Sequence, residues 1–187
     1  MADLGKLETP HGAVFFRELR ASDLRGMLRH INLLISEDAF LNVSGKPYSL
    51  AEERDWLERE LKLQRKRQAV HVVAEAGGRV IGLASVHRQG SKPRMMKCMH
   101  VGIFGIAVSD PEFRGCGVGE KLARTVLEKA GKIGIRLAIL DFSEGNRPAQ
   151  RLYKKVGFKE YGCLPEAYIH RGKFIDKTFM YKSLLCR

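Results

Sequence analysis

The strongest constraint on the fold of this chain is a stretch in which a strand, a glycine-rich turn and a helix follow one another directly. Residues Ile103–Val108 form an apolar run with the length and β-branched content of a buried strand. Ser109, Asp110 and Pro111 then break the run, as turn-forming residues do. After the glycine-rich segment 114–119, apolar residues recur at the spacing of one helical face: Leu122, Ala123, Val126, Leu127 and Ala130. The stretch therefore predicts a strand that leads through a tight turn into an amphipathic helix.

A glycine-rich turn at the start of a helix is suited to hold a phosphate group. Free backbone N–H groups and the positive end of the helix dipole converge on an anion there. Glycine is needed because a Cβ atom would hold the backbone away from the anion and disfavour positive φ. The stretch therefore indicates a phosphate-binding turn.

The spacing of the glycines distinguishes among the known kinds of phosphate-binding turn. The dinucleotide fingerprint G-x-G-x-x-G fails at its third glycine, where this chain has Glu120. The nucleotide P-loop, G-x-x-x-x-G-K-[ST], has no match anywhere in the chain. The pattern that fits is R-x-x-G-x-G, formed by Arg114, Gly117 and Gly119.

A second strand-turn-helix unit follows further along the chain. Arg136–Phe142 reads as another buried strand. Asn146 offers a helix N-cap, and Pro148 lies in the first turn, where its missing N–H costs little. Gly157 supplies the C-terminal stop. The apolar positions of the predicted helix are Ala149, Leu152, Tyr153 and Val156.

These two units resemble the two signatures of the GNAT superfamily of N-acetyltransferases. The segment Arg114–Gly119 resembles the acyl-CoA signature, and Asn146–Phe158 resembles N-x-x-A-x-x-L-Y-x-x-x-G-F at every defined position. The resemblance covers roughly Val14 to Leu185. It implies an α/β fold with a mixed, mostly antiparallel central sheet of six to seven strands flanked by about four helices. The implied order is β-α-α-β-β-β-α-β-α-β-β.

The remaining patterns agree with that order. Gly77-Gly78 predicts a two-residue hairpin between strands, and Ser49–Glu52 has the form of a capping box that opens a helix. Ser22 is predicted to cap an earlier helix that runs to about Leu34. The other predicted strands are Ala13–Leu19, Val70–Ala76, Arg79–His87, Lys159–Leu164, Ala167–His170 and Lys177–Leu184.

Length and composition favour one globular domain. With 187 residues, 44% of them hydrophobic and 29% charged, the chain is long enough for one sizeable core. We therefore expect a single domain over residues 1–187, with its core at about 14–185. No apolar run approaches the ~20 residues of a membrane span, and the first residues show no signal-peptide pattern.

The cysteine spacing and the net charge limit the cellular compartment and the kinds of binding partner that we expect. The four cysteines, Cys98, Cys116, Cys163 and Cys186, lack C-x-x-C spacing, so we expect no metal site, no disulfide and a cytoplasmic protein. The net charge of +12 favours a generally basic surface, because arginine and aromatic residues are not interleaved as in RNA-stacking proteins. We expect neither a DNA partner nor a membrane partner.

The resemblance implies that acetyl-CoA (coenzyme A) is the cofactor and that particular residues bind it. In the family the central strand parts from its neighbour at a bulge, and its unpaired backbone groups meet the pantetheine and the thioester carbonyl. The pyrophosphate lies on the backbone of the glycine-rich turn, Arg114 shapes or charges that turn, and the asparagine that caps the later helix often contacts the cofactor. Carried onto this chain, the cofactor-binding residues are Ile106, Ala107, Val108, Arg114, Gly115, Cys116, Gly117, Val118, Gly119 and Asn146.

The catalytic residue that the resemblance implies is Tyr153, as the general acid that protonates the departing CoA thiolate. A thiol of pKa ~8.5 and a phenol of pKa ~10 are close enough for useful proton transfer. A nucleophilic role for Cys116 is disfavoured because no base is paired with it.

The general base stays open in the sequence. Relatives often carry a glutamate where this chain has Ile103 or Phe104, so the simplest assignment is missing. A histidine in a strand, such as His71, is more often structural than catalytic. The candidates are Glu37, Asp38, His100, Asp141, Glu144 or a water molecule.

The resemblance implies that the acetyl acceptor is an amine, but the sequence does not determine which class of amine it is. Ser49–Leu57 and Leu164–Tyr181 resemble the branch that contains ribosomal-protein-alanine and small-amine acetyltransferases. The resemblance implies that the hairpin near Tyr168 to Asp176 borders the acceptor site or a dimer contact. A peptide N-terminus and a small-molecule amine both stay open, as does a homodimer, since pairs of chains are common in the family. The alternatives to an enzyme are a non-catalytic acyl-CoA-binding or regulatory module and a basic RNA- or ribosome-associated protein.

Overall fold

The structure is a computed structural model that describes residues 4–38, 45–89 and 96–185. Cys186 lies outside the described residues. None of the helices in those three segments combines the length and the hydropathy that a membrane-spanning helix needs.

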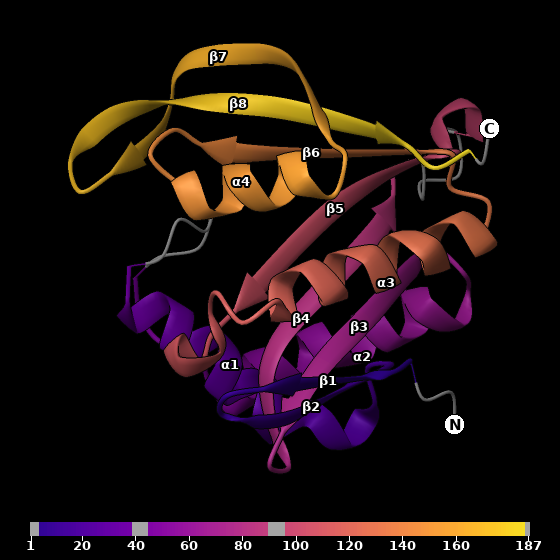
Figure 1. The fold of residues 1–187 in the computed structure, drawn as a ribbon, viewed down its shortest axis with the longest axis vertical. Coiled ribbons are helices and arrows are strands. Elements are labelled where there is room, and N and C mark those ends of the chain that lie inside the picture. The colour runs from indigo at the N-terminus through magenta and orange to yellow at the C-terminus, as the bar shows by residue number, and fades with distance from the viewer. Residues whose placement is uncertain (1–3, 39–44, 90–95, 186–187) are drawn as a thin grey trace.

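An eight-stranded mixed sheet organises the chain (Figure 1). Its strand order is β1-β2-β3-β4-β5-β6-β8-β7, and each neighbouring pair is antiparallel except β5 and β6. The strands are β1 (Lys6–Thr9), β2 (Gly12–Arg17), β3 (Ala69–Ala76), β4 (Arg79–Arg88), β5 (Val101–Val108), β6 (Leu137–Ser143), β7 (Lys159–His170) and β8 (Lys173–Ser183). The helices are α1 (Leu24–Ser36), α2 (Leu50–Arg65), α3 (Val118–Lys132) and α4 (Arg147–Lys155).

The predicted fold class is confirmed, with one strand more than expected. The sheet is mixed and mostly antiparallel, and the predicted order of elements is correct once β1 is added. Strand β1 was missed because it has four residues, contains a single large apolar side chain, Leu7, and lies partly exposed. Its pairing with β2, rather than any pattern of its own, makes it a strand.

Two local predictions need correction. The predicted strands Lys159–Leu164 and Ala167–His170 are one strand, β7, whose register with β8 shifts between Leu164 and Tyr168. Ser22 does not cap α1: it lies in a short 3₁₀ turn, and Asp23 holds the N-cap position. The Asp23 carboxylate forms a part-buried ion pair with Arg17, at 2.8 Å, and accepts from the Arg20 N–H, so both contacts hold Asp23 at the start of the helix.

Other local predictions are confirmed. Gly77 and Gly78, with φ of +53° and +73°, turn β3 into β4. Ser49 and Glu52 form the capping box of α2, since the Ser49 hydroxyl accepts from the Glu52 N–H and the Glu52 carboxylate accepts from the Ser49 N–H. Gly157, at φ +92°, follows the end of α4.

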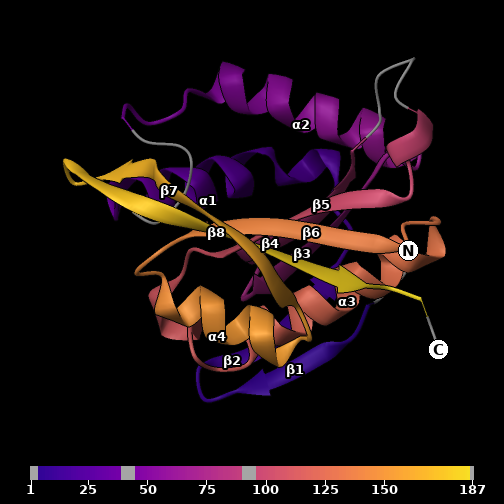
Figure 2. The ribbon, with the colours of Figure 1, turned by 90° about the horizontal axis from the view of Figure 1, so that it is seen from above.

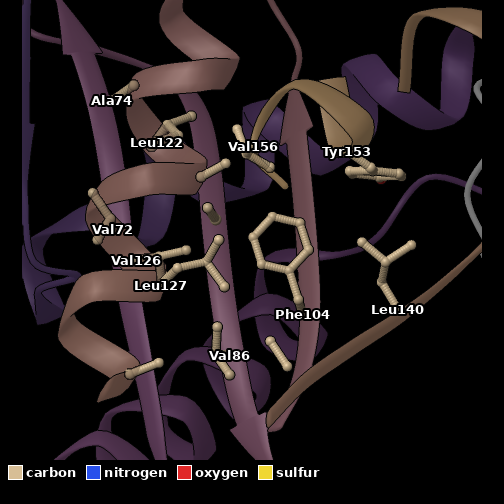
Figure 3. Packing of buried hydrophobic residues seen from close by; sticks show 14 of the residues in the cluster. Val72, Ala74, Val86, Phe104, Leu122, Val126, Leu127, Leu140, Tyr153 and Val156 are labelled. Carbon is tan, nitrogen blue, oxygen red and sulfur yellow. The ribbon is translucent and has the colours of Figure 1, made fainter. Parts of the chain in front are cut away.

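The helices cover the two faces of the sheet in pairs. Figure 2 shows α1 and α2 on one side of the sheet and α3 and α4 on the other. Val72 packs with the α3 cluster, whereas its neighbour Val73 packs in the α1–α2 cluster; both are fully buried. Figure 3 shows the α3 side, where Leu122 and Val126 face the strands. Burial on both faces explains why β3 is apolar at nearly every position.

The parallel pair in the middle of the sheet is short. β5 and β6 pair only from Val101 to Ile103 and from Leu137 to Ile139. Beyond these residues β5 stays with β4, β6 stays with β8, and the two strands diverge (Figure 1). The sheet is therefore split from this point to the C-terminal end of β5.

Gly102 holds the closed end of this split, and we expect Gly102→Ala to destabilise the fold. A Cβ atom there would lie 2.5 Å from Val86 Cγ1 and 2.9 Å from Ile135 Cγ2, so the core must shift. Overpacking of this kind costs about 1–3 kcal/mol of the free energy of unfolding. Urea unfolding measures the loss, with Gly105→Ala in the same strand as control, because its Cβ would meet only Ser85 Oγ at 3.7 Å. Equal stability of the two variants would contradict the packing described.

Candidate functional site

A cleft of about 890 Å³ opens where β5 and β6 diverge. Its walls come from both strands, from the glycine-rich turn before α3 and from α4. The end of α1 and the turn between β7 and β8 close one end. The predicted residues that line it are Ile106, Ala107, Val108, Arg114, Gly115, Gly117, Gly119, Asn146 and Tyr153. Cys116 and Val118 do not line it with their side chains, although they belong to the same turn.

The backbone of β5 presents alternate residues to the cleft. The Ser109 N–H donates to the Ile81 carbonyl of β4 at 2.9 Å, so odd-numbered residues of this strand bond to β4. The backbone groups of Ile106 and Val108 therefore face away from β4, on the side that β6 has left. Those of Ala107 point to β4, so the three predicted residues are not equivalent.

The bulge that the resemblance implied for the central strand is absent. The register of β4 with β5 is regular from Gly82 and Val108 to Arg88 and Gly102. The unpaired backbone arises instead because β6 turns away after its third paired residue, Ile139.

The glycine-rich turn presents a row of unpaired N–H groups. Gly115 and Gly117 have φ of +77° and +84°, and Gly117 is the N-cap of α3. Within the described segments, none of the backbone N–H groups of residues 115–119 donates a hydrogen bond. Successive free N–H groups at a helix N-terminus form a site for an anion such as phosphate.

Arg114 ties this turn to its surroundings. Its Nε donates to the Val108 carbonyl at 2.9 Å and its Nη2 to the Ser109 carbonyl at 3.0 Å. The same Nη2 lies 2.6 Å from Glu37 Oε2, at the end of α1. Arg114 therefore shapes the turn by fixing it to the end of β5 and to α1.

Asn146 is the N-cap of α4, as predicted. Its Oδ1 accepts a hydrogen bond from the Ala149 N–H at 3.2 Å. Asn146 also lines the cleft, so the same residue caps α4 and forms part of the cleft wall.

Tyr153 reaches the cleft from an aromatic cluster. Its ring centroid lies 6.0 Å from that of Phe104, 5.7 Å from that of Phe142 and 6.1 Å from that of Phe158, and the residue is only 7% exposed. Figure 3 shows Tyr153 and Phe104 among the buried side chains of this cluster. No residue in the described part of the chain bonds to its hydroxyl, yet no fully buried side-chain oxygen there lacks a partner. The hydroxyl therefore opens into the cleft.

The surroundings of Tyr153 keep its hydroxyl protonated. Burial, and in second place the charge of Asp141, raise the pKa of Tyr153 to about 12. At neutral pH the residue is thus a hydrogen-bond donor aimed at whatever occupies the cleft.

Three of the predicted candidates for a general base lie in the cleft, and each is paired with a cation. The pairs are Glu37 with Arg114 at 2.6 Å, Asp38 with Arg171 at 3.0 Å and Asp141 with Lys177 at 3.0 Å.

The other candidates lie elsewhere. Glu144 lines a separate pocket of about 480 Å³ beside the cleft. His100 is exposed before the start of β5 and lines neither pocket. His71 is fully buried beside Glu60, on a different part of the sheet.

The hairpin near residues 168–176, which the branch resemblance placed at the acceptor site or at a dimer contact, contains the turn between β7 and β8 and borders the cleft. His170 and Arg171 line the cleft, and Arg171 bonds to Asp38 across 133 residues of sequence. The Arg171-Gly172 turn signal predicts a hairpin there, but its position beside α1 depends on the order of strands in the sheet.

A family model described as "Acetyltransferase (GNAT) family" matches residues 35–158. A curated relative, the L-methionine sulfoximine/L-methionine sulfone acetyltransferase of Pseudomonas paraeruginosa, is 26% identical over 172 residues, which span 90% of this chain and 93% of that protein.

Solved structures share the fold. The ribosomal-protein-alanine N-acetyltransferase of Brucella melitensis has a TM-score of 0.77 at 25% identity, covering 90% of this chain and 98% of that one. A GNAT superfamily phosphinothricin acetyltransferase of Sinorhizobium meliloti, crystallised in complex with acetyl-CoA, has a TM-score of 0.77 at 22% identity, covering 91% and 88%.

The environment of Tyr153 predicts different effects for two substitutions. Tyr153→Phe removes a hydroxyl without a protein partner, so we expect the free energy of unfolding to change by less than about 0.5 kcal/mol. Tyr153→Ala empties the centre of the aromatic cluster and should cost about 3–5 kcal/mol. Urea unfolding of both variants measures this difference. A large loss in Tyr153→Phe would mean that the hydroxyl supports the fold.

Proposed function

The chain belongs to the acetyltransferase (GNAT) family, and we propose that it transfers the acetyl group of acetyl-CoA to a primary amine by direct attack in a ternary complex. The observation that carries the proposal is one continuous cleft that joins an anion-binding turn, the unpaired backbone of β5 and the Tyr153 hydroxyl. Bound acetyl-CoA supplies an acetyl thioester; the protein binds it, orients it and stabilises charge.

The residues of the cleft fit this cosubstrate. The free N–H groups of residues 115–119 and the N-terminus of α3 would hold its pyrophosphate. The backbone groups of Ile106 and Val108 that β6 leaves unpaired would hold the amide-containing arm. Since the Val108 carbonyl already accepts from Arg114, the N–H groups of these two residues are the donors available to the arm and to the thioester carbonyl.

Backbone N–H groups of β5 also stabilise the oxyanion that develops on the thioester carbonyl. A backbone N–H group of β5, already fixed by pairing with β4, costs no reorganisation when negative charge appears on the carbonyl oxygen. We assign this role to the N–H groups of Ile106 and Val108.

Tyr153 assists the departure of the sulfur. A phenol of pKa about 12 is a weaker acid than a thiol near ~8.5, so full transfer to a free thiolate is unfavourable. The hydroxyl instead donates a hydrogen bond to the sulfur while negative charge develops there. The high pKa keeps that proton in place across the neutral range.

The attacking amine must first lose a proton, since amines titrate near ~10. Glu37, Asp38 and Asp141 supply three carboxylates within the cleft. The proton leaves to one of these groups or to water. The acceptor is a peptide N-terminus or a small-molecule amine, and the names of the relatives include both a ribosomal-protein alanine and an amino-acid derivative.

We further propose that residues 1–187, with a core at about 14–185, act as a single acetyltransferase domain in the cytoplasm. Cys98, Cys116 and Cys163 are free thiols, which accords with a reducing compartment.

A thermal melt tests the cosubstrate. At about 100 times its dissociation constant, acetyl-CoA should add ~2.7 kcal/mol of stability, whereas NADH and ATP should add little. Gly117→Ala should reduce the shift, because a side chain at φ +84° strains the turn. Gly131→Ala, in the open on α3, is the matched control. No shift, or equal shifts with all three ligands, would overturn the assignment.

Initial rates test the role of Tyr153. With acetyl-CoA and an acceptor found by the mass gain of one acetyl group, Tyr153→Phe should lower kcat by about 100-fold or more while keeping the thermal shift with acetyl-CoA. Tyr161→Phe, exposed on β7 and outside the cleft, should keep the wild-type rate. Rates that intersect in double-reciprocal plots would support the ternary complex. A fully active Tyr153→Phe would exclude the proposed role.

A further inference from the structure

Three side chains with metal-ligating atoms meet outside the cleft. Glu60 of α2 places its Oε2 atom 3.0 Å from His71 Nε2 on β3 and 2.6 Å from His87 Nε2 on β4. The three ligand atoms all lie within 4.8 Å of one another. They sit between α2 and the sheet, on the face opposite to α3 (Figure 2).

This cluster is shielded on most sides. The His71 side chain is fully buried and that of Glu60 is 7% exposed, whereas that of His87 is 34% exposed. Arg59 Nε is 3.7 Å from Glu60, but from the other carboxylate oxygen, Oε1. Among the described residues, the Oε2 atom therefore contacts only the two imidazoles, and the cluster opens to solvent on the His87 side.

The hydrogen bonds around His71 leave a lone pair directed at the carboxylate. His71 Nδ1 lies 3.2 Å from Gln64 Oε1, and Gln64 Nε2 donates to the Leu19 carbonyl at 3.4 Å. With the amide oriented in this way, Nδ1 carries the hydrogen and Nε2 is unprotonated in the neutral ring. Two electron-rich atoms then face each other at 3.0 Å, an arrangement that a bound cation would stabilise.

We propose that Glu60, His71 and His87 bind a divalent transition-metal ion, for which zinc fits best. Two imidazole nitrogens and one carboxylate oxygen form a ligand set that zinc uses, and imidazole favours such ions over magnesium and calcium. Bonds of about 2.0–2.2 Å in a tetrahedron separate ligand atoms by about 3.3 Å, so the present contacts need to open by less than about 1 Å. Water completes the coordination on the exposed His87 side.

Gln64 and the fold support this site. The Gln64 carbonyl orients His71 from behind, as outer partners of metal-bound histidines do. The ion joins α2 to β3 and β4, so that its role is to hold this helix on the sheet. The site is independent of acetyl transfer, because none of its three residues lines the cleft.

Cobalt and zinc titrations of the full-length chain, freed of any histidine tag and stripped with a chelator, test the proposal. One equivalent of Co²⁺ should give the intense visible absorption of a tetrahedral ion, Zn²⁺ should displace it, and Zn²⁺ should raise the melting temperature. His87→Gln, at the least buried ligand, should weaken binding by at least about 10-fold. His100→Gln, an exposed histidine elsewhere, should bind as the wild type does.

Each result of these titrations decides the question. Stoichiometric tetrahedral cobalt that is lost in His87→Gln and kept in His100→Gln would establish the site. No zinc-dependent melting shift, an octahedral cobalt spectrum, or equal binding by both variants would show that the three side chains form only a hydrogen-bonded cluster. The titration of the wild-type chain is decisive even if a variant fails to fold.

Discussion

The parting of β5 from β6 is the feature on which the rest of this structure depends. The two strands pair over three residues, and the core side chains around Gly102 close the sheet at that end. Beyond Ile103, the backbone of β5 has a partner on one side only, and strand polar groups without a partner are costly unless a ligand or water bonds to them. The split thus creates both the space of the cleft and its binding groups, without a bulge in either strand.

The groups around the split are held by contacts that also serve the fold. Arg114 bonds to the end of β5 and to Glu37, so the glycine-rich turn, the strand and α1 keep one arrangement. Tyr153 is part of the aromatic core, and its hydroxyl opens into the cleft. Side chains fixed by packing in this way act on a substrate without further ordering, which is what preorganised catalysis requires.

Much of the fold could be predicted because its signals are local. The order of elements, the Gly77-Gly78 hairpin and the Asn146 cap follow from spacings within a few residues. Strand β1 escaped prediction because its pairing, and not its composition, defines it. The expected cap at Ser22 was wrong because Asp23 takes the N-cap position, where its carboxylate pairs with Arg17, a residue outside the helix.

The sequence by itself determined the two strand-turn-helix units and the glycine-rich turn, since periodicity and glycine spacing act through neighbouring backbone atoms. The choice of Tyr153 came from the resemblance of Asn146–Phe158 to the family signature. Only the tertiary structure decided which side chains meet. Arg114 and Glu37 are 77 residues apart and Arg171 and Asp38 are 133 apart, while Glu60, His71 and His87 follow no metal-binding spacing. These long-range contacts depend on the order of the strands and on which helix covers which face of the sheet, and local sequence patterns predict neither.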